Sequence, residues 1–180
     1  MNQILVVPYD PEWVEKFALA SSEITAALGD NLLEIHHIGS TSIPEIHAKP
    51  VIDMLAIVAD IATLDEYSEQ FKSLGYEVMG EFGIEGRRYF RRDNAAGIRT
   101  HQIHTFQTGS PQIPRHLAFR DFLRTHKELA EQYSDLKQKL AKAHPYDMNA
   151  YMDGKDDFIK EMEKRALAWT ETDRLLRPIS

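Results

Sequence analysis

The chain contains no cysteine among its 180 residues. A disulfide scaffold, a zinc ribbon, an iron–sulfur site and a thiol nucleophile are therefore excluded, and any metal would have to be held by His, Asp or Glu. Nine glycines and eight prolines are too few for a collagen-like or low-complexity sequence. No apolar run approaches the roughly 20 residues that span a bilayer, so we expect no membrane partner.

The first residues, MNQILVVPYDPEW, have no cationic start, and Pro8 interrupts their apolar run. They do not have the pattern of a signal peptide, so we expect a cytoplasmic protein. Hydrophobic residues make up 43% of the chain and charged residues 27%. This balance can bury a core, and the length fits one domain.

The net charge of −7 argues against general nucleic-acid binding. The charge is unevenly distributed, because residues 85–124 carry eight arginines, three acidic residues and no lysine. Arginine forks match the oxygens of carboxylates and phosphates. The segment is therefore either an anion-binding surface or an ordinary solvated surface of strands and helices.

Hydrophobic periodicity predicts an α+β fold, in which helices pack on a mixed sheet and the last third of the chain is helical. The sequence predicts one domain over residues 1–170 and a C-terminal tail over 171–180. Helices are expected over 10–28 and 63–74 and after Pro111 and Pro114, and strands over 32–38, 51–58, 76–79, 87–92 and 98–106.

The segment HIGSTSIPEIHAKPVID, residues 37–53, has the most unusual composition. Gly39, Ser40, Thr41 and Ser42 form a turn of small residues as a strand ends. Consecutive amides in such a turn can bind an anion, and the hydroxyls can add donors to phosphate oxygens. The alternative is an ordinary polar turn.

Asp53 lies inside an otherwise apolar strand, where an unpaired carboxylate would be costly. It needs a partner, which is either a cation such as Lys49 or a metal ion. The strand at 98–106 carries His104, and if the two strands are neighbours this imidazole could complete a metal site with Asp53. A lone strand histidine is more often a packed core group.

Several strings together resemble the GrpB family, which belongs to the nucleotidyltransferase-like superfamily. They are HIGSTSIPEIHAKPVIDMLAIV, GRRYF, the His-x-x-His of residues 101–104, RHLAFRDFLRTH, YSDLKQKLA, AYMDGKDDFI and RALAW. The resemblance covers the chain from about Tyr9 to Trp169. It implies a nucleotidyltransferase fold, in which a Gly-Ser signature follows one strand and carboxylates on later strands hold two divalent metals.

This sequence matches that pattern only in part. Gly39 and Ser40 match the signature, and Asp53 matches the first carboxylate. Leu55 occupies the second carboxylate position, and the third falls on the strand of Gln102 and His104. Glu45 also stands where the family usually has glycine.

The resemblance and the residues together predict a small phosphate-bearing ligand or nucleotide as partner and a divalent cation as cofactor, either Mg²⁺, Mn²⁺ or another transition metal. The predicted metal ligands are Asp53 and His104, and the predicted catalytic residues are Asp53, Lys49 and His104. The predicted substrate-binding residues are Gly39, Ser40, Thr41, Ser42, Arg88, His116 and Arg120.

Three functions stay open at this point. The first is a divergent enzyme of nucleotidyl or phosphoryl transfer. The second is a nucleotide- or cofactor-binding module without catalysis, for which relatives fused to dephospho-CoA kinase suggest a coenzyme A connection. The third is a partner-docking domain. Leu55 favours the last two, whereas the grouped polar residues favour the first two.

Overall fold

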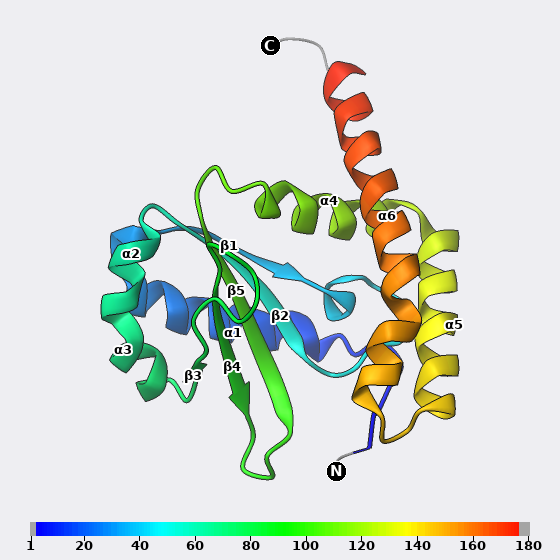
Figure 1. Ribbon diagram of the computed structural model, residues 1–180, viewed down its shortest axis with the longest axis horizontal. Helices are drawn as coiled ribbons and strands as arrows, with labels where there is room; N and C mark the ends of the chain where they lie inside the picture. The colour runs from blue at the N-terminus through cyan, green and yellow to red at the C-terminus, as the bar shows by residue number, and fades with distance from the viewer. Residues whose placement is uncertain (1–2, 177–180) are drawn as a thin grey trace.

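A computed structural model describes residues 3–176 of the protein. Its centre is one five-stranded mixed sheet in the order β1-β2-β5-β4-β3 (Figure 1). β2 and β5 are parallel, and the other neighbouring pairs are antiparallel. The strands are β1 (Leu32–Ile38), β2 (Ile52–Val58), β3 (Glu77–Val78), β4 (Arg88–Asp93) and β5 (Arg99–Gln107). The predicted α+β class is confirmed, and each predicted strand has a counterpart.

Six α-helices and three short 3₁₀ turns accompany the sheet within residues 3–176. The helices are α1 (Glu12–Leu28), α2 (Ile61–Leu64), α3 (Ser68–Ser73), α4 (Gln112–Thr125), α5 (Lys127–Ala143) and α6 (Met148–Leu176). The 3₁₀ turns are η1 (Gly29–Asn31), η2 (Ser40–Ser42) and η3 (Asp65–Tyr67).

Most predicted bounds shift by one or two residues, and two of the differences have a local cause. The helix predicted over 63–74 is divided into α2, η3 and α3, and it begins earlier because the Asp60 side chain caps the amide of Ala62 at 2.9 Å. The tail predicted over 171–180 is helical as far as Leu176, since Pro178 is the first helix-breaking residue after Gly154. Residues 177–180 lie outside the described part of the chain.

The two faces of β2 pack against different elements, as the alternation of the strand predicts. Ile52, Met54, Ala56 and Val58 join a cluster with residues of α1 such as Trp13. On the opposite face, Leu55 and Ile57 pack beneath Leu117 of α4. Asp53 lies at the end of this second face, beyond the apolar cluster that α4 covers.

The last three helices form a separate layer beside the sheet. Their own core joins α4, α5 and α6 to Ile43 and Ile46, which follow η2. In Figure 1, α5 and α6 run side by side across from β4 and β5, and α4 runs above the strands toward the upper end of α5. No helix in residues 3–176 has a stretch that is both long and apolar enough to cross a lipid bilayer.

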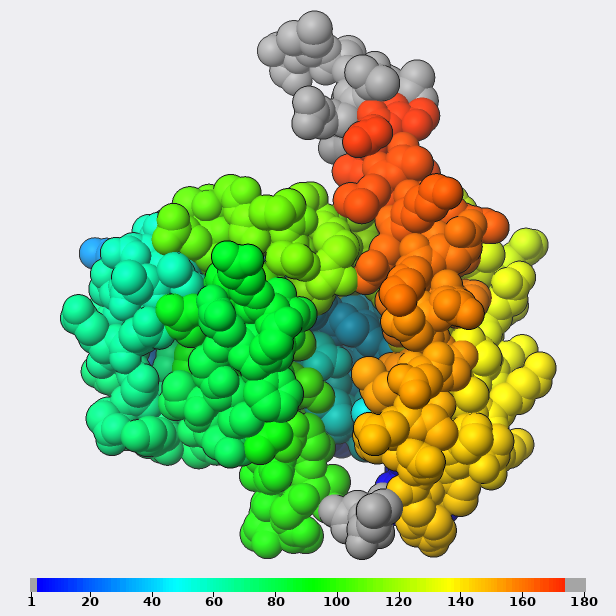
Figure 2. All heavy atoms as spheres, viewed as in Figure 1, coloured from blue at the N-terminus to red at the C-terminus, as the bar shows by residue number. Residues whose placement is uncertain are grey.

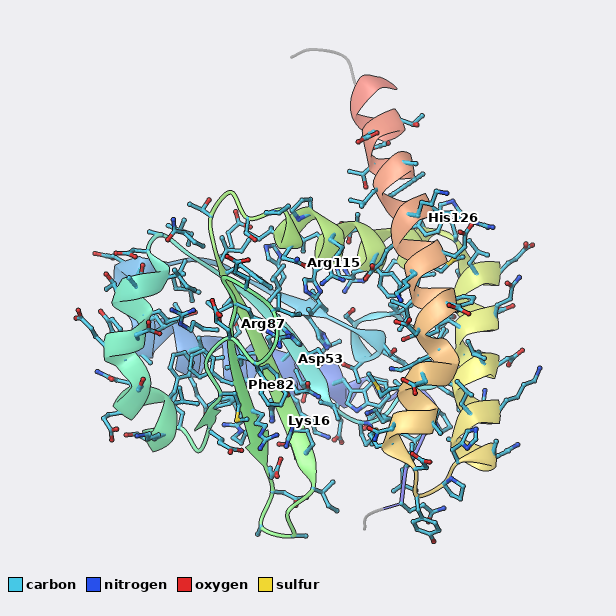
Figure 3. All side chains as sticks on the ribbon, viewed as in Figure 1. Lys16, Asp53, Phe82, Arg87, Arg115 and His126 are labelled. Carbon is cyan, nitrogen blue, oxygen red and sulfur yellow. The ribbon has the colours of Figure 1, made fainter. Side chains whose placement is uncertain are left out.

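The molecular surface is hollowed between the strands and the helical layer. Figure 2 shows this hollow between the region of β4 and α6, with atoms coloured as residues of about 40–60 at its floor. In Figure 3, Asp53 lies on β2, with α6 across from it. We call this hollow the Asp53 cleft.

Candidate functional site

The register of β2 and β5 brings together the two predicted metal ligands. Asp53 is paired with Gln102 and Leu55 with His104, so all four side chains belong to one face of the sheet. His104 Nε2 lies 4.0 Å from Asp53 Oδ1. The two strands are therefore neighbours, which is the condition on which the sequence-based site depended. Within the described residues, no Lys or Arg nitrogen lies within salt-bridge distance of Asp53.

Gly39 lies directly against Asp53 at the end of β1. Its φ is +70°, and a β-carbon built there would lie 2.5 Å from Asp53 Oδ2. Only glycine tolerates this combination of a left-handed backbone and a close approach. The glycine of the predicted turn is therefore required by the position of the carboxylate.

The hydroxyls of the turn have different surroundings. Thr41 Oγ1 donates to the carbonyl of Val51 at 3.0 Å and is 2.9 Å from His37 Nε2. Ser42 Oγ donates to the carbonyl of Gly39 at 2.6 Å. Both groups brace the turn and are buried, whereas Ser40 hydrogen-bonds to Tyr133 of α5. Ser40 is therefore the hydroxyl of the turn that points toward the helical layer.

Three lysines lie close to one another near Asp53: Lys49 and Lys155 interact electrostatically with its carboxylate, and both also act on the buried Lys137. Lys49 precedes β2, Lys137 belongs to α5 and Lys155 belongs to α6. Lys137 Nζ is 4.3 Å from the centre of the Tyr133 ring and donates to the carbonyl of His47 at 2.5 Å. Lys155 and Lys49 lie 5.1 and 5.5 Å from the centre of the Tyr151 ring. Each ammonium group is therefore held against an aromatic face.

Burial disfavours the charged form of each of these lysines. It lowers the pKa of Lys137 to about 7, and the charges of Lys155 and Lys49 lower it further. Burial likewise lowers the pKa of Lys155 to about 8, with Lys49 adding to the effect and Asp53 opposing it. Burial also lowers the pKa of Lys49, again against the opposing effect of Asp53. The three lysines thus disfavour one another's charge, and the Asp53 carboxylate offsets this effect at Lys49 and Lys155.

The acid of the cleft is shifted in the opposite direction. Burial raises the pKa of Asp53 to about 6, although Lys49 and Lys155 act to lower it. Its side chain keeps 26% of its surface exposed, so it remains accessible from the cleft. A carboxylate with a pKa near the working pH can both accept and release a proton.

The arginine that reaches the site is Arg87, and the predicted Arg88 lies elsewhere. Arg88 is on the opposite face of β4, where it donates two hydrogen bonds to Asp65 at 2.6 and 2.9 Å. Arg87 Nη1 lies 3.3 Å from His104 Nδ1. Because side chains alternate along a strand, a shift of one residue exchanges the two faces.

His116 and Arg120, which were both predicted to face the cleft from α4, have separate environments. The His116 ring is centred 5.6 Å from that of His104, in agreement with the prediction. Burial, with the charges of Arg115 and Arg87, lowers the pKa of His116 to about 4. Arg120 instead contacts Asp121 at 2.7 Å and donates to the carbonyl of His37 at 3.2 Å. We therefore leave Arg120 out of the cleft.

The donors present fit part of the coordination of one metal ion. Asp53 and His104 are two possible ligands on one wall of the cleft, but within residues 3–176 no group of three or more His, Asp or Glu residues is arranged to hold a metal. Leu55, at the second carboxylate position, is fully buried in the apolar cluster below α4. The two-metal site that the resemblance implies therefore does not fit these residues.

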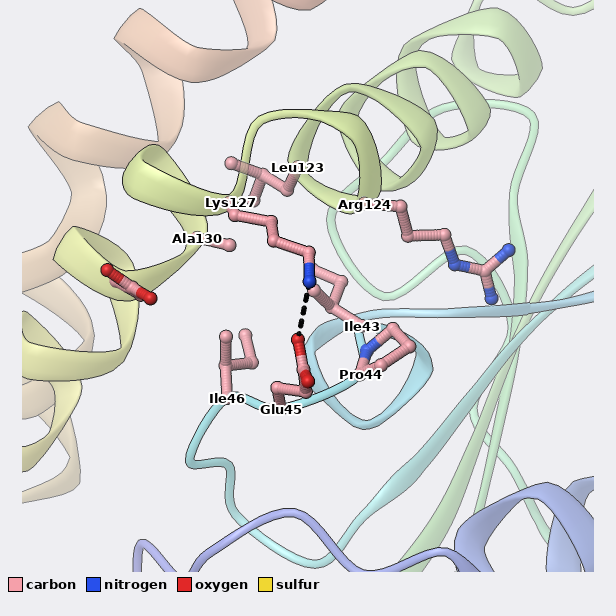
Figure 4. A pocket seen from close by; sticks show the side chains of 9 residues that line it. Ile43, Pro44, Glu45, Ile46, Leu123, Arg124, Lys127 and Ala130 are labelled. Carbon is pink, nitrogen blue, oxygen red and sulfur yellow. Dashed lines mark hydrogen bonds and ion pairs between the residues drawn. The ribbon is translucent and has the colours of Figure 1, made fainter.

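Two further cavities lie on the other side of the turn. One, of about 240 Å³, lies between residues 43–46 and the α4–α5 junction. In Figure 4 the Lys127–Glu45 ion pair of 3.1 Å crosses it. The second, of about 350 Å³, is lined by Phe17, His37, Arg120 and other residues. Arg124 lines both and donates to the carbonyl of Ser42 at 2.8 Å, so these cavities border the back of the turn.

The sequence reading missed the lysines and tyrosines of the helical layer, although a local signal for them exists. The strings YSDLK (133–137) and YMDGK (151–155) share the pattern Tyr-x-Asp-x-Lys. A spacing of four places the tyrosine and the lysine on one helix face. The same pattern in two neighbouring helices indicates two equivalent ring-supported ammonium groups.

Comparison with known proteins identifies the family to which the chain is similar. The family model described as GrpB protein matches residues 3–165. The UPF0157 protein YqkA of Bacillus subtilis is 43% identical over 93% of this chain, which spans 48% of that relative's length. The dephospho-CoA kinase of Mycobacterium leprae is 24% identical over 93% of this chain and 47% of its own length.

Solved structures extend the comparison to the fold. The crystal structure of the conserved protein GrpB from Enterococcus faecalis has a TM-score of 0.89 and 46% identity, covering 92% of this chain and 99% of that one. The Cid1 poly(U) polymerase with bound MgGTP has a TM-score of 0.52 and 14% identity, covering 76% of this chain and 44% of that one. The second likeness supports the nucleotidyltransferase-like fold. Because the GrpB family model matches most of this chain, residues 3–165, the chain belongs to the GrpB family.

Proposed function

We propose that the Asp53 cleft binds a phosphate-bearing ligand of the nucleotide class. The observation that carries the proposal is the group of three neighbouring lysines, Lys49, Lys137 and Lys155, of which Lys49 and Lys155 share the single carboxylate of Asp53. Mutual repulsion and burial make this arrangement unfavourable without an anion. A polyphosphate would compensate the charge, with Ser40 and the nearby turn as further donors.

The predicted divalent cation is part of this proposal. Asp53 and His104 would supply two ligands to one Mg²⁺ or Mn²⁺, and phosphate oxygens of the ligand would supply others. Such an ion would neutralise phosphate charge next to Asp53. Because the cleft is rich in cations, we expect metal binding to depend on the anion.

Binding without two-metal catalysis is the better supported activity, since Leu55 removes the second carboxylate. A second candidate is transfer of a nucleotidyl or phosphoryl group. Asp53 favours it, because a carboxylate with a pKa of about 6 can take a proton from an attacking hydroxyl. The similarity to dephospho-CoA kinases makes coenzyme A and dephospho-CoA further ligands to test. We include a cytoplasmic location in the proposal, where such ligands are met.

Calorimetry can test the proposal with tripolyphosphate, the four ribonucleoside triphosphates and coenzyme A, each with and without Mg²⁺ or Mn²⁺. Lys155→Met should weaken binding about tenfold, corresponding to the loss of one charged contact. Lys160→Met is the matched control on α6, because Lys160 is exposed and pairs with Asp156 at 2.5 Å. Equal affinities for wild type, Lys155→Met and Lys160→Met, or no binding of any compound, would overturn the proposal.

The metal component has its own test. Asp53→Asn and His104→Ala should each abolish or strongly reduce the gain in affinity that Mn²⁺ gives to tripolyphosphate. If Mn²⁺ has the same effect on wild type and both variants, the ion is bound by the ligand alone, and Asp53 and His104 are not metal ligands.

A further inference from the structure

Phe82 is an exposed aromatic residue at the strand-side wall of the cleft. It lies in the segment between β3 and β4, and 55% of its surface is accessible. Its φ is +46°, a left-handed conformation that residues with a β-carbon rarely adopt. Non-glycine residues held in this region often mark functional positions.

The surrounding segment fixes this residue in place. Arg87 Nη2 donates to the Phe82 carbonyl at 2.6 Å, and Arg87 Nε donates to the Glu81 carbonyl at 3.1 Å. The Glu81 carboxylate accepts from the amide of Gly86 at 2.9 Å. Arg87 also contacts His104. The same guanidinium thus links the backbone of Phe82 to the wall of the site.

A series of aromatic rings leads from Phe82 to Asp53. Phe82 stacks on Tyr89 with ring centres 5.3 Å apart and an interplanar angle of 28°. Tyr89 lies 5.4 Å from the His104 ring, and His104 Nε2 is 4.0 Å from Asp53 Oδ1. In Figure 3, Phe82 and Arg87 lie on the strand side of Asp53, with α6 across from them.

We propose that the exposed ring of Phe82 is a stacking platform for a planar group of the bound ligand, with a nucleobase as the chemical class that fits. This inference rests on the proposed function, because it takes the lysines as the site of the phosphates. Aromatic stacking suits any base, since every base has a π-face. The platform would therefore favour nucleotides over simple polyphosphates while discriminating little between bases.

Titration of tripolyphosphate, ATP and UTP into wild type, Phe82→Ala and Phe82→Trp tests the inference. Phe82→Ala should weaken ATP and UTP about 5- to 150-fold, the range of one lost stacking contact, and leave tripolyphosphate unchanged. Phe82→Trp should retain affinity for ATP and UTP, and its added fluorescence should be quenched by ATP but not by tripolyphosphate. Ile98→Ala is the control, because Ile98 is similarly exposed at 46% but lies between β4 and β5.

The outcomes separate this inference from the proposed function. If tripolyphosphate binds and Phe82→Ala leaves all three affinities unchanged, the lysine site stands and the platform is overturned. Equal weakening of tripolyphosphate and ATP by Phe82→Ala also overturns it, because the loss is then structural. If no compound binds the wild type, both proposals fail together.

Discussion

A β-carbon at Gly39 would lie 2.5 Å from Oδ2 of Asp53. The turn and the carboxylate therefore fit together only because residue 39 has no side chain. Gly39→Ala should destabilise the protein by about 2 kcal/mol or more, of which about 1 kcal/mol is the left-handed backbone. Chemical denaturation measures this change.

Gly97→Ala is the matched control for that measurement. Gly97 has a similar φ of +72° but no neighbour within 4 Å of a built β-carbon. Its substitution therefore measures only the free-energy cost of placing alanine at a positive φ. The difference between the two variants should shrink in an Asp53→Ala background, which removes the carboxylate oxygens. Equal losses at the two glycines would contradict the close approach.

Replacing Asp53 by Asn should stabilise the protein in the absence of ligand. The carboxylate has no Lys or Arg partner within salt-bridge distance among the described residues, and its pKa is raised from 3.8 to about 6. The native state therefore binds the proton more tightly, and stability falls as pH rises from about 4 to 6. Removing this charge should add about 1–3 kcal/mol at pH 7 and abolish that part of the pH dependence.

Asp135→Asn on α5 is the control, because Asp135 is exposed. A loss of stability in Asp53→Asn would mean instead that the carboxylate neutralises a cation in the free protein. Asp53→Asn should also bind Mn²⁺ with tripolyphosphate more weakly than the wild type. In this variant, a gain in stability would accompany a loss in binding.

Acid should destabilise the protein through His37, which is 8% exposed. Burial, followed by the charges of Arg124 and Arg120, lowers the pKa of His37 from 6.5 to about 4. The stabilising contribution is complete above pH 6.5 and is lost as pH falls toward 4, because the unfolded chain then binds the proton first. Between pH 7 and 5, His37→Gln should lose about 2 kcal/mol less stability than the wild type. A His37 ring that titrates near 6.5 by NMR would refute this.

Glu45 has a φ of +69° and an exposed ion pair with Lys127. Glu45→Ala and Glu45→Gly both remove the ion pair, but only glycine relieves the left-handed backbone. The glycine variant should therefore be more stable than the alanine variant by about 1 kcal/mol. Thermal denaturation of the two variants side by side gives the comparison, and a more stable alanine variant would contradict the assigned backbone conformation.

Binding of a polyphosphate should be accompanied by proton uptake at pH 8. The pKa of Lys137 is lowered to about 7 and that of Lys155 to about 8, so both are partly neutral there, and a nearby anion raises both values. Calorimetry of tripolyphosphate in buffers of different ionisation enthalpy should show uptake of about one proton. Lys160→Met should retain this uptake and Lys155→Met should reduce it. Proton release would contradict the assigned environment.

Local pattern was sufficient for most of the sheet. β1 has the predicted bounds, and β2 begins one residue later than expected, because continuous apolar runs and alternating faces are properties of the chain itself. The proximity of Asp53 and His104 could also be predicted from the sequence, because it required only that β2 and β5 be neighbours.

The residues of the opposite wall of the cleft, on α5 and α6, could not be predicted from local pattern, because tertiary packing decides which of them meet. Lys137 is 1% exposed. Its spacing from Tyr133 places it on the buried face of α5, but the identity of its neighbours is decided only when α6 and Lys49 are in place. Arg87 was missed for a different reason, because an error of one residue in the inward face of β4 selects Arg88 instead.

Asp53 and Lys155 are close enough to interact electrostatically, although they come from opposite halves of the chain. The cleft therefore cannot assemble from local contacts, and its two walls meet only after a long loop closure that favours late formation in folding. A nascent chain that still lacks α6 carries Asp53 without Lys155, and it leaves the apolar surfaces of α4 and α5 that α6 later covers open to other chains. Synthesis of the last helix is thus the step that adds Lys155 and completes the second wall of the Asp53 cleft.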